Sequence, residues 1–347
     1  MRRACIIGVI LVCCGLAACL LYHWRMSVSA DNHVSVSTND QLNEKLLSAL
    51  IQGCNDAVSA IKSGRGTLTE HEWDYTYEDP EGLLETETTY KLAFAGEKYR
   101  VSEKVTYLRN DADSSVRYPV KPGTKILTEA AFDGQKMTMF NPSCKRARVG
   151  SIGSSVAPAI MWGEHMRYKG GIMVVGSEPT MEGHGVSRID KFVPSRYQTD
   201  KGLHVARRES LDGQECIVVE RIIERSFPDG RKGTSTYEYW IDPTRGFMIP
   251  RIRVWGEGGP LRERTLLLES NTELRQYGDS LWGPAKYTHV RYKLDDKGGV
   301  QLDYRRVITY GDDFQLNVPV SDSELALKLP PGTLVHDTDL DETYTSP

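Results

Sequence analysis

The sequence lacks the residue patterns that mark the common enzyme active sites. Its eight histidines are scattered, and none forms the His-x-x-x-His spacing of a zinc site. The serines Ser151, Ser154 and Ser155 lie outside any Gly-x-Ser-x-Gly turn, which carries the nucleophile of many hydrolases. The glycine-rich stretches Gly183–Gly185 and Gly256–Gly259 lack the strand-to-helix context of a phosphate-binding loop. We therefore predict a protein that is not an enzyme, with no catalytic residue, no cofactor and no metal ion.

Cysteine is scarce outside the N-terminal segment. Four of the seven cysteines lie within that segment, at Cys5, Cys13, Cys14 and Cys19. The three that remain are an odd number without a Cys-x-x-Cys spacing: Cys54, Cys144 and Cys216. This pattern argues against a disulfide framework and against a zinc knuckle. We predict buried free thiols, with a single disulfide bridge as the alternative.

Neither sign of charge dominates the chain. The formal net charge is −4, and acidic and basic residues are interspersed without a basic stripe. Binding to nucleic acid, or to an anionic membrane surface through clustered basic residues, is therefore not expected. Hydrophobic residues make up 39% of the chain, which is enough for a substantial core and argues against general disorder.

One stretch near the C-terminus resembles the start of a calcium-binding loop. Asp337, Asp339 and Asp341 alternate with other residues as in the first half of an EF-hand. The sixth position holds Glu342, where the sharp turn of that loop requires glycine. We therefore predict no calcium site in this stretch.

The N-terminal segment, residues 1–26, predicts that the protein is inserted into a membrane or exported across it. Two arginines precede an uncharged run over residues 4–24, which is about the length that spans a bilayer. Three fates remain open: a membrane anchor, a signal peptide cleaved after Ala30, or a lipoprotein signal in which Cys19 carries the lipid. In each case the arginines hold the N-terminus inside. The body of the protein is therefore expected on the extracytoplasmic side, membrane-anchored or periplasmic.

A short tether and one amphipathic helix are predicted next. Residues 27–38 are polar and suit a tether. Asn39 or Asp40 can cap the start of the helix, and Ser63-Gly64 ends it. Apolar residues recur along this segment at helical spacing: Leu42, Leu46, Leu50, Ala57 and Ile61. Such a stripe predicts a helix that packs on a sheet.

From Gly66 onward the period of the apolar residues changes from that of a helix to that of a strand. The aromatic residues of the first strand alternate with acidic ones and are His71, Trp73, Tyr75 and Tyr77. The acidic residues are Glu70, Glu72 and Asp74. This alternation predicts a half-buried strand whose aromatic face packs on the core and whose acidic face meets water.

Turn signals divide the rest of the chain into hairpins. The clearest is Tyr237–Trp255, where residues 242–246 (Asp-Pro-Thr-Arg-Gly) supply turn chemistry between two strands. Asp-Gly pairs at 133–134 and 212–213 mark two further hairpins. We predict about 11–13 strands in sequential antiparallel order, interrupted by a short middle helix at Pro158–Tyr168.

These elements predict an α+β protein that is mostly β. A single sheet of this width must curl or close, so we expect a curved antiparallel half-barrel. The N-terminal amphipathic helix and the short middle helix would cover its apolar face. No break in composition interrupts residues 66–330, so we predict a single domain over residues 39–330, followed by an irregular tail at 331–347.

The sequence resembles the LolA/LolB-type superfamily of outer-membrane lipoprotein-sorting carriers. The likeness rests on the amphipathic helix, on the meander of strands and on the late hairpin. In that hairpin the residues that match an aromatic strand, an Asp-Pro turn and a return strand are Trp240, Ile241, Asp242, Pro243 and Gly246. The resemblance implies an open half-barrel whose apolar concavity holds acyl chains. The carriers are near half the length of this chain, which has extra loops.

Large apolar residues of the strands are candidates to line such a cavity, and the filling of a solid core is the alternative. The candidates are Trp73, Tyr75, Leu92, Phe94, Val101, Met137, Met139 and Trp240. We hypothesise an envelope protein that binds a lipid, an acyl chain or a lipidated partner such as a lipoprotein, at ~0.8 kcal/mol per buried methylene. The alternative is a structural or sensory envelope protein of the same fold with a packed core, acting by protein–protein contact.

Overall fold

The computed structural model describes a large part of the chain, with gaps. The described ranges are 36–75, 83–110, 120–151, 177–178, 187–188, 198–227, 230–261, 263–279, 281–294 and 299–347. The N-terminal segment with Cys19, the cleavage point after Ala30 and the middle helix expected at Pro158–Tyr168 lie outside these ranges. Within them, no helix combines the length and the hydropathy needed to cross a membrane.

The chain divides into two compact units, Met1–Leu46 and Leu47–Pro347, and the boundary falls within helix α2 (Val36–Ala60). In the second unit, the remaining turns of α2 bury Leu50 and Cys54. These two residues are four positions apart and therefore share one face of the helix. The predicted amphipathic helix is thus present, and it begins three residues before the expected cap at Asn39.

Among the described residues, the second unit is built on one sheet of 16 strands. Its strands are β1 (Ser63–Tyr75), β2 (Leu83–Ala95), β3 (Lys98–Asn110), β4 (Lys125–Phe132), β5 (Lys136–Asn141), β6 (Arg146–Ser151), β9 (Gln198–Leu211), β10 (Gln214–Ser226), β11 (Lys232–Asp242), β12 (Met248–Gly258), β13 (Thr265–Tyr277), β14 (Leu281–Leu294), β15 (Val300–Tyr310), β16 (Gln315–Leu316), β17 (Leu334–Asp337) and β18 (Glu342–Thr345). Two further short strands, β7 (Ser177–Glu178) and β8 (Ser187–Arg188), pair with each other. A short helix, α4 (Asp322–Leu325), follows β16.

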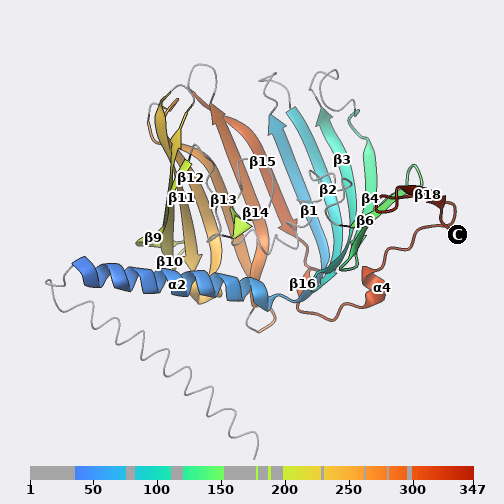
Figure 1. The fold of residues 1–347 in the computed structure, drawn as a ribbon, viewed down its shortest axis with the longest axis horizontal. Coiled ribbons are helices and arrows are strands. Elements are labelled where there is room, and N and C mark those ends of the chain that lie inside the picture. The colour runs from blue at the N-terminus through green and yellow to red at the C-terminus, as the bar shows by residue number, and fades with distance from the viewer. Residues whose placement is uncertain are drawn as a thin grey trace, which may run out of the picture. The chain divides into compact units, whose positions relative to one another are not determined.

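The order of the strands places the first and the last long strand side by side. From β1 the chain runs outward strand by strand to β6, and it resumes with β9 at the opposite edge and returns to β15. Leu68 of β1 is the cross-strand partner of Tyr310 of β15. In Figure 1 the blue β1 lies next to the orange β15, in the middle of a curved sheet. In the described part of the chain no pairing joins the edge strands β9 and β18, so the sheet is open and the predicted half-barrel is confirmed.

The predicted turn of the central hairpin is confirmed in detail. The carboxylate of Asp242 accepts hydrogen bonds from the backbone N–H groups of Thr244 and Arg245, over the short 3-10 helix η1 (Pro243–Arg245). Gly246 ends that helix in the left-handed region at φ 70°, which glycine adopts without strain. The register shifts between Trp240 and Asp242, opposite the segment that contains Pro250. Pro250 has no backbone N–H to donate to the neighbouring strand, and it therefore lies where the pairing is irregular.

The prediction of an irregular tail at 331–347 is wrong. Strand β17 adds to the sheet in parallel with β6, and β18 pairs antiparallel with β17. These strands have four residues each and, like the two-residue β16, are too short to show a period of two. They are the reason why the sheet has more strands than the 11–13 predicted.

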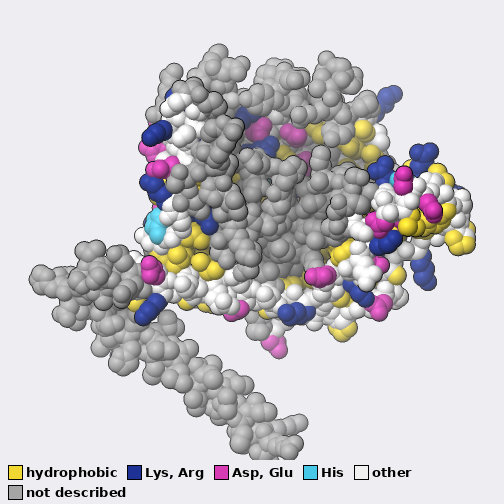
Figure 2. Space-filling model, in the orientation of Figure 1, with side chains coloured by type: hydrophobic (Ala, Val, Ile, Leu, Met, Phe, Trp, Pro, Cys, Tyr) yellow, Lys and Arg dark blue, Asp and Glu magenta, His cyan; other side chains and the backbone are white. Residues whose placement is uncertain are grey.

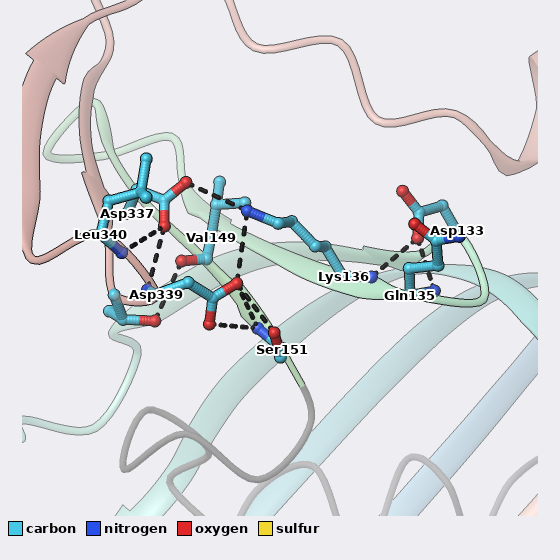
Figure 3. Close-up of polar contacts among 9 residues, drawn as sticks. Asp133, Gln135, Lys136, Val149, Ser151, Asp337, Asp339 and Leu340 are labelled. Atoms are coloured by element: carbon cyan, nitrogen blue, oxygen red, sulfur yellow. Dashed lines mark hydrogen bonds and ion pairs between the residues drawn. The ribbon is translucent and has the colours of Figure 1, made fainter.

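A polar cluster fastens this C-terminal hairpin to the sheet (Figure 3). The ammonium group of Lys136 on β5 lies 3.3 Å from a carboxylate oxygen of Asp337 and 3.3 Å from one of Asp339. Asp339 also accepts hydrogen bonds from the backbone N–H and the hydroxyl of Ser151. The stretch that resembles a calcium loop therefore has a lysine side chain between its carboxylates, and it connects β17 to β5 and β6.

Candidate functional site on the core face of the sheet

One face of the sheet carries the largest apolar cluster, and we call it the core face. Cross-strand partners point to the same side of a sheet, so Leu68, Tyr90 and Tyr310 lie together on this face. The buried members of the cluster are Leu68, Tyr90, Leu92, Phe94, Tyr99, Val101, Ala130, Phe132, Tyr277, Ile308, Tyr310, Phe314 and Leu316. Five partly buried residues pack against them: Ile61, Met137, Met139, Leu281 and Tyr287.

Five of the eight candidate lipid-binding residues meet in this cluster. Leu92, Phe94 and Val101 are buried in it, whereas Met137 and Met139 pack against it and remain partly exposed. Unbranched methionine side chains adapt to irregular apolar surfaces. The structure therefore brings together an apolar surface from β2, β3 and β5 with adaptable side chains at its border.

The other three candidates, Trp73, Tyr75 and Trp240, lie on the opposite face, and the face assignment of the first strand is thereby corrected. One row of cross-strand partners on that face runs from His71 through Val307, Thr288, Asn271 and Arg251 to Trp240. His71 stacks on Trp73 with ring centroids 3.8 Å apart, and its Nε2 atom lies 2.6 Å from a carboxylate oxygen of Glu85. The side chain of His71 is 32% exposed, so it is not the core histidine that the pattern indicates.

Trp240 is nevertheless fully buried on that opposite face. It packs with Leu211, Cys216 and Val218. The guanidinium groups of three arginines, Arg207, Arg251 and Arg253, lie 5.5–5.7 Å from the centre of its ring. Long arginine side chains cover apolar surface while their charged ends stay in water, which explains how a residue outside the core cluster has no exposed surface.

A network of polar side chains occupies the middle of the core face, which we call the polar network. It begins on β1, where Glu70 and Glu72 share the parity of Leu68. Arg306 on β15 lies 3.6 Å from the carboxylate of Glu70 and 3.0 Å from that of Glu72. The hydroxyl of Tyr304 donates a hydrogen bond of 2.8 Å to the same oxygen of Glu72. Glu70 is only 4% exposed, so this charge is buried and paired.

The polar network continues across β14 to β13. The ring of His289 lies 5.9 Å from that of Tyr304 in an edge-to-face arrangement. Its Nδ1 atom is 2.9 Å from the hydroxyl of Ser270 and 3.2 Å from that of Tyr287. A serine hydroxyl within this distance of an imidazole is the first requirement of a nucleophile and base pair. Ser270 is only 2% exposed and also accepts a hydrogen bond from Tyr287.

Two buried carboxylates, those of Glu70 and Glu103, lie where the polar network meets the apolar cluster. Glu103 of β3, 5% exposed, is the cross-strand partner of Tyr90, and Glu70 lies one row away on the same face. Burial, followed by the charges of Glu70 and Glu103, raises the pKa of Tyr90 well above its usual value. Tyr90 therefore remains a neutral hydroxyl beside two buried carboxylates.

Sequence reasoning missed the polar network because its members come from strands at opposite ends of the chain. The seam between β1 and β15 joins residues near position 70 to residues near position 306, and no local pattern reports that pairing. One signal was present, however. Leu68 shares its parity with Glu70 and Glu72, so the acidic side of the first strand is also the side of its buried leucine.

A shallow hollow of about 380 Å³ lies on the opposite face, over β2, β1, β15 and β14. It is lined by Thr69, His71, Trp73, Glu87, Lys286, Thr288, Arg305, Val307 and Thr309. Acidic and basic side chains are also mixed on the visible surface of the described residues, with hydrophobic ones between them (Figure 2).

The structure is similar to solved structures over most of the chain. A DUF1329 family protein from Desulfovibrio piger is 14% identical, with 80% of this chain and 96% of that protein covered and a TM-score of 0.37. A LolA superfamily protein from Nitrosomonas europaea is 11% identical, with 81% and 97% covered and a TM-score of 0.33. LprF from Mycobacterium bovis is 10% identical, with 79% and 95% covered and a TM-score of 0.27.

No protein-family model matches the sequence, and no curated protein matches it. The superfamily that the sequence resembles is among the similar structures. All three TM-scores are below 0.5, and the function proposed below therefore rests on the residues of this chain: an open, curved antiparallel sheet with an apolar cluster on one face and a polar network beside it.

Proposed function

We propose that this protein is an extracytoplasmic binding protein that holds an acyl chain, free or attached to a lipidated partner, against the core face of its sheet. The observation that carries the proposal is the meeting of Leu92, Phe94, Val101, Met137 and Met139 in one apolar cluster. Each methylene that such a surface removes from water contributes ~0.8 kcal/mol. The role is that of a binding protein, and no step of catalysis is part of it.

The location proposed for the protein follows from residues 1–26. An uncharged run of this length behind two arginines is typical of an anchor or an export signal. A body outside the cytoplasm that is tethered to a membrane would meet acyl chains at the bilayer surface. The membrane, a lipid and lipidated proteins are thus the proposed partners, whereas nucleic acid is not.

The proposal is tested with the full-length chain, purified in a mild nonionic detergent. Native mass spectrometry detects lipid that is carried through purification, and titration with a fluorescent fatty acid measures an affinity. We expect bound lipid and saturable binding of the probe. A protein that is empty and also leaves the probe unbound would refute the proposal.

A matched pair of variants tests whether the bound acyl chain lies on the core face. Met139→Gln keeps the length of the side chain but makes it polar, and we expect about fourfold weaker probe binding, which corresponds to roughly one lost methylene contact. Thr138→Gln changes the adjacent residue of β5, whose side chain points to the opposite face. Equal affinities of the two variants would place the acyl chain elsewhere.

The alternative function is that of a structural or sensory envelope protein with a solid core. Its support is the packing of Tyr99 and Phe132, whose rings lie 5.9 Å apart and which are 2% and 7% exposed. A cluster closed in this way would leave no room for a chain. The two functions are separated by the same titration, because a closed core binds no probe but is expected to bind a protein partner.

A further inference from the structure

We propose that Tyr99 recognises the carbonyl oxygen at the head of the bound acyl chain, and that the protein therefore prefers an acyl ester or an acyl amide to an alkyl ether, which has no carbonyl. The inference rests on the proposed function, since it concerns the same face of the sheet. It adds the atom of the ligand that the protein contacts and the chemical class that this contact selects.

Tyr99 lies among the residues that carry the proposed function. Its cross-strand partners are Phe94 on β2 and Phe132 on β4, and Val101 follows two positions later on the same face. Beyond Phe132 the same row reaches Met137, at the partly exposed border of the apolar cluster. Met137 is two strands away from Tyr99, about 10 Å at ~4.8 Å per strand, which is less than the length of an extended palmitoyl chain. An acyl chain that begins at Tyr99 can therefore run to that border.

The hydroxyl of Tyr99 is buried without a hydrogen-bond partner. The residue is 2% exposed, and in the part of the chain that the structure describes no group donates to its oxygen or accepts from it. Buried polar atoms are normally paired, because an unpaired one loses its hydrogen bonds to water without compensation. Phenylalanine rings occupy both neighbouring places in the row, at Phe94 and Phe132. Packing alone therefore does not explain why the ring at position 99 carries an oxygen.

The surroundings of this hydroxyl make it a hydrogen-bond donor that needs an acceptor. Burial is the single cause that raises the pKa of Tyr99, to about 12, so the phenol keeps its proton at neutral pH. Its side chain stands away from the sheet and is longer than those of Val101 and Ala130, which form the next pair on the same face. The hydroxyl therefore lies where a ligand on the apolar cluster would lie. A carbonyl oxygen of the ligand accepts its hydrogen bond, whereas a methylene in the same place accepts none.

A second tyrosine of the apolar cluster has the partner that Tyr99 lacks. The hydroxyl of Tyr277 donates a hydrogen bond of 2.6 Å to the backbone carbonyl of Pro284. Both tyrosines belong to the same cluster, and they are 2% and 9% exposed. The two residues therefore allow the same substitution, tyrosine to phenylalanine, at a hydroxyl without a partner and at a hydroxyl with one.

The experiment is a competition between lipids of equal chain length on the full-length chain in nonionic detergent. 1-Monopalmitoylglycerol is an ester, N-palmitoylserinol is the corresponding amide, and 1-O-hexadecylglycerol has a methylene in place of the carbonyl group. Each acyl lipid is mixed with the ether lipid in equal amounts, and native mass spectrometry gives the ratio of the two adducts. We expect this ratio to be about fivefold lower in Tyr99→Phe than in the unchanged protein, which corresponds to ~1 kcal/mol. The acyl lipid with the larger decrease identifies an ester or an amide as the ligand.

Tyr277→Phe is the matched control, because it removes a hydroxyl from the same cluster. Its ratio of acyl to ether adduct should equal that of the unchanged protein, since the lost hydroxyl bonds to Pro284. Urea unfolding of the protein after extraction of its lipid gives a second measurement. Tyr99→Phe should raise the midpoint of unfolding, because it removes a buried oxygen without a partner, and Tyr277→Phe should lower it, because it breaks a hydrogen bond.

The outcomes separate the inference from the function on which it rests. Ratios that stay the same in Tyr99→Phe for both acyl lipids would overturn the inference and leave binding of the chain in place. Ratios that fall equally in Tyr99→Phe and Tyr277→Phe would also overturn it, and so would a Tyr99→Phe protein that is less stable than the unchanged one, since its hydroxyl would then have a partner in the empty protein. Absence of every adduct would overturn the proposed function together with the inference.

Discussion

The thiol of Cys54 donates a hydrogen bond of 3.3 Å to the backbone carbonyl of Phe247, 193 positions later in the chain. This contact joins the end of helix α2 to the turn between β11 and β12. The neighbouring Gly53 lies against the ring of Phe247 so closely that a Cβ atom built at that position would be 2.5 Å from two ring carbons. The absence of a side chain at residue 53 is therefore what allows the helix to approach the sheet.

We expect Gly53→Ala to destabilise the protein by about 1–3 kcal/mol, as overpacking of a core does. The sign is informative, because the same substitution in an exposed helix stabilises by roughly 1 kcal/mol. Urea unfolding measures the difference. Ser48→Ala, at an exposed position of the same helix, is the control and should change the free energy of unfolding by less than about 0.5 kcal/mol. A stabilised Gly53→Ala would contradict the contact.

The three cysteines of the second unit should differ sharply in reactivity. Burial raises the pKa of the Cys54 thiol to about 12 and that of Cys216 to about 11. Both therefore lack the thiolate form at neutral pH, which is the form that reacts. Cys144 is exposed. We expect iodoacetamide to label Cys144 in the folded protein and the other two only after unfolding, as mapped by peptide mass spectrometry. Labelling of Cys54 at the rate of Cys144 would show that α2 does not stay docked.

The carboxylate of Asp242 should make the stability of the central hairpin depend on pH. Burial alone would raise its pKa, but hydrogen bonds from Thr244 and Arg245 outweigh this effect and hold the pKa below its usual value. A group with a lowered pKa in the folded state stabilises above its unfolded pKa, about 3.9, and loses that contribution as the pH falls through the folded value.

Asp242→Asn should therefore cost roughly 1–3 kcal/mol near neutral pH, the usual penalty for breaking hydrogen bonds to a buried charged group. The difference between the two proteins should stay constant down to about pH 5 and shrink below about pH 4. Urea unfolding at several pH values checks this course. A difference that grows in acid would mean that the protonated form of Asp242 is the stabilising one.

Lys136 is expected to control the attachment of the C-terminal hairpin. Lys136→Met removes the cation between Asp337 and Asp339 and leaves these carboxylates to repel each other. Hydrogen exchange should become faster in β17 and β18, with little change at β11 and β12. Lys125→Met alters an exposed lysine of β4 and should leave the exchange of the hairpin as it is. If β17 keeps its protection from hydrogen exchange in Lys136→Met, then the backbone pairing with β6, and not the lysine, holds the hairpin in place.

Local chemistry explains what the sequence alone could predict. The turn at Asp242 is specified by five consecutive residues, and the hairpins at 133–134 and 212–213 by two each, so these were found. The side of β1 that faces the core was assigned wrongly, because its aromatic residues outweigh Leu68 in any count of hydrophobicity. His71 and Trp73 instead stack on each other at the opposite surface. The polar network depends on the partner of β1, and that partner is fixed by the topology of the whole sheet.

The seam between β1 and β15 also sets the order of events in folding. Leu68 cannot meet Tyr310 until nearly the entire polypeptide has been synthesised, and contacts between such distant residues form slowly. Until then the first hairpins expose an unpaired strand edge along β1, and such edges promote aggregation with other chains. A chain threaded through a membrane in extended form would benefit from this delay, since its sheet could not be completed before the last long strand had crossed.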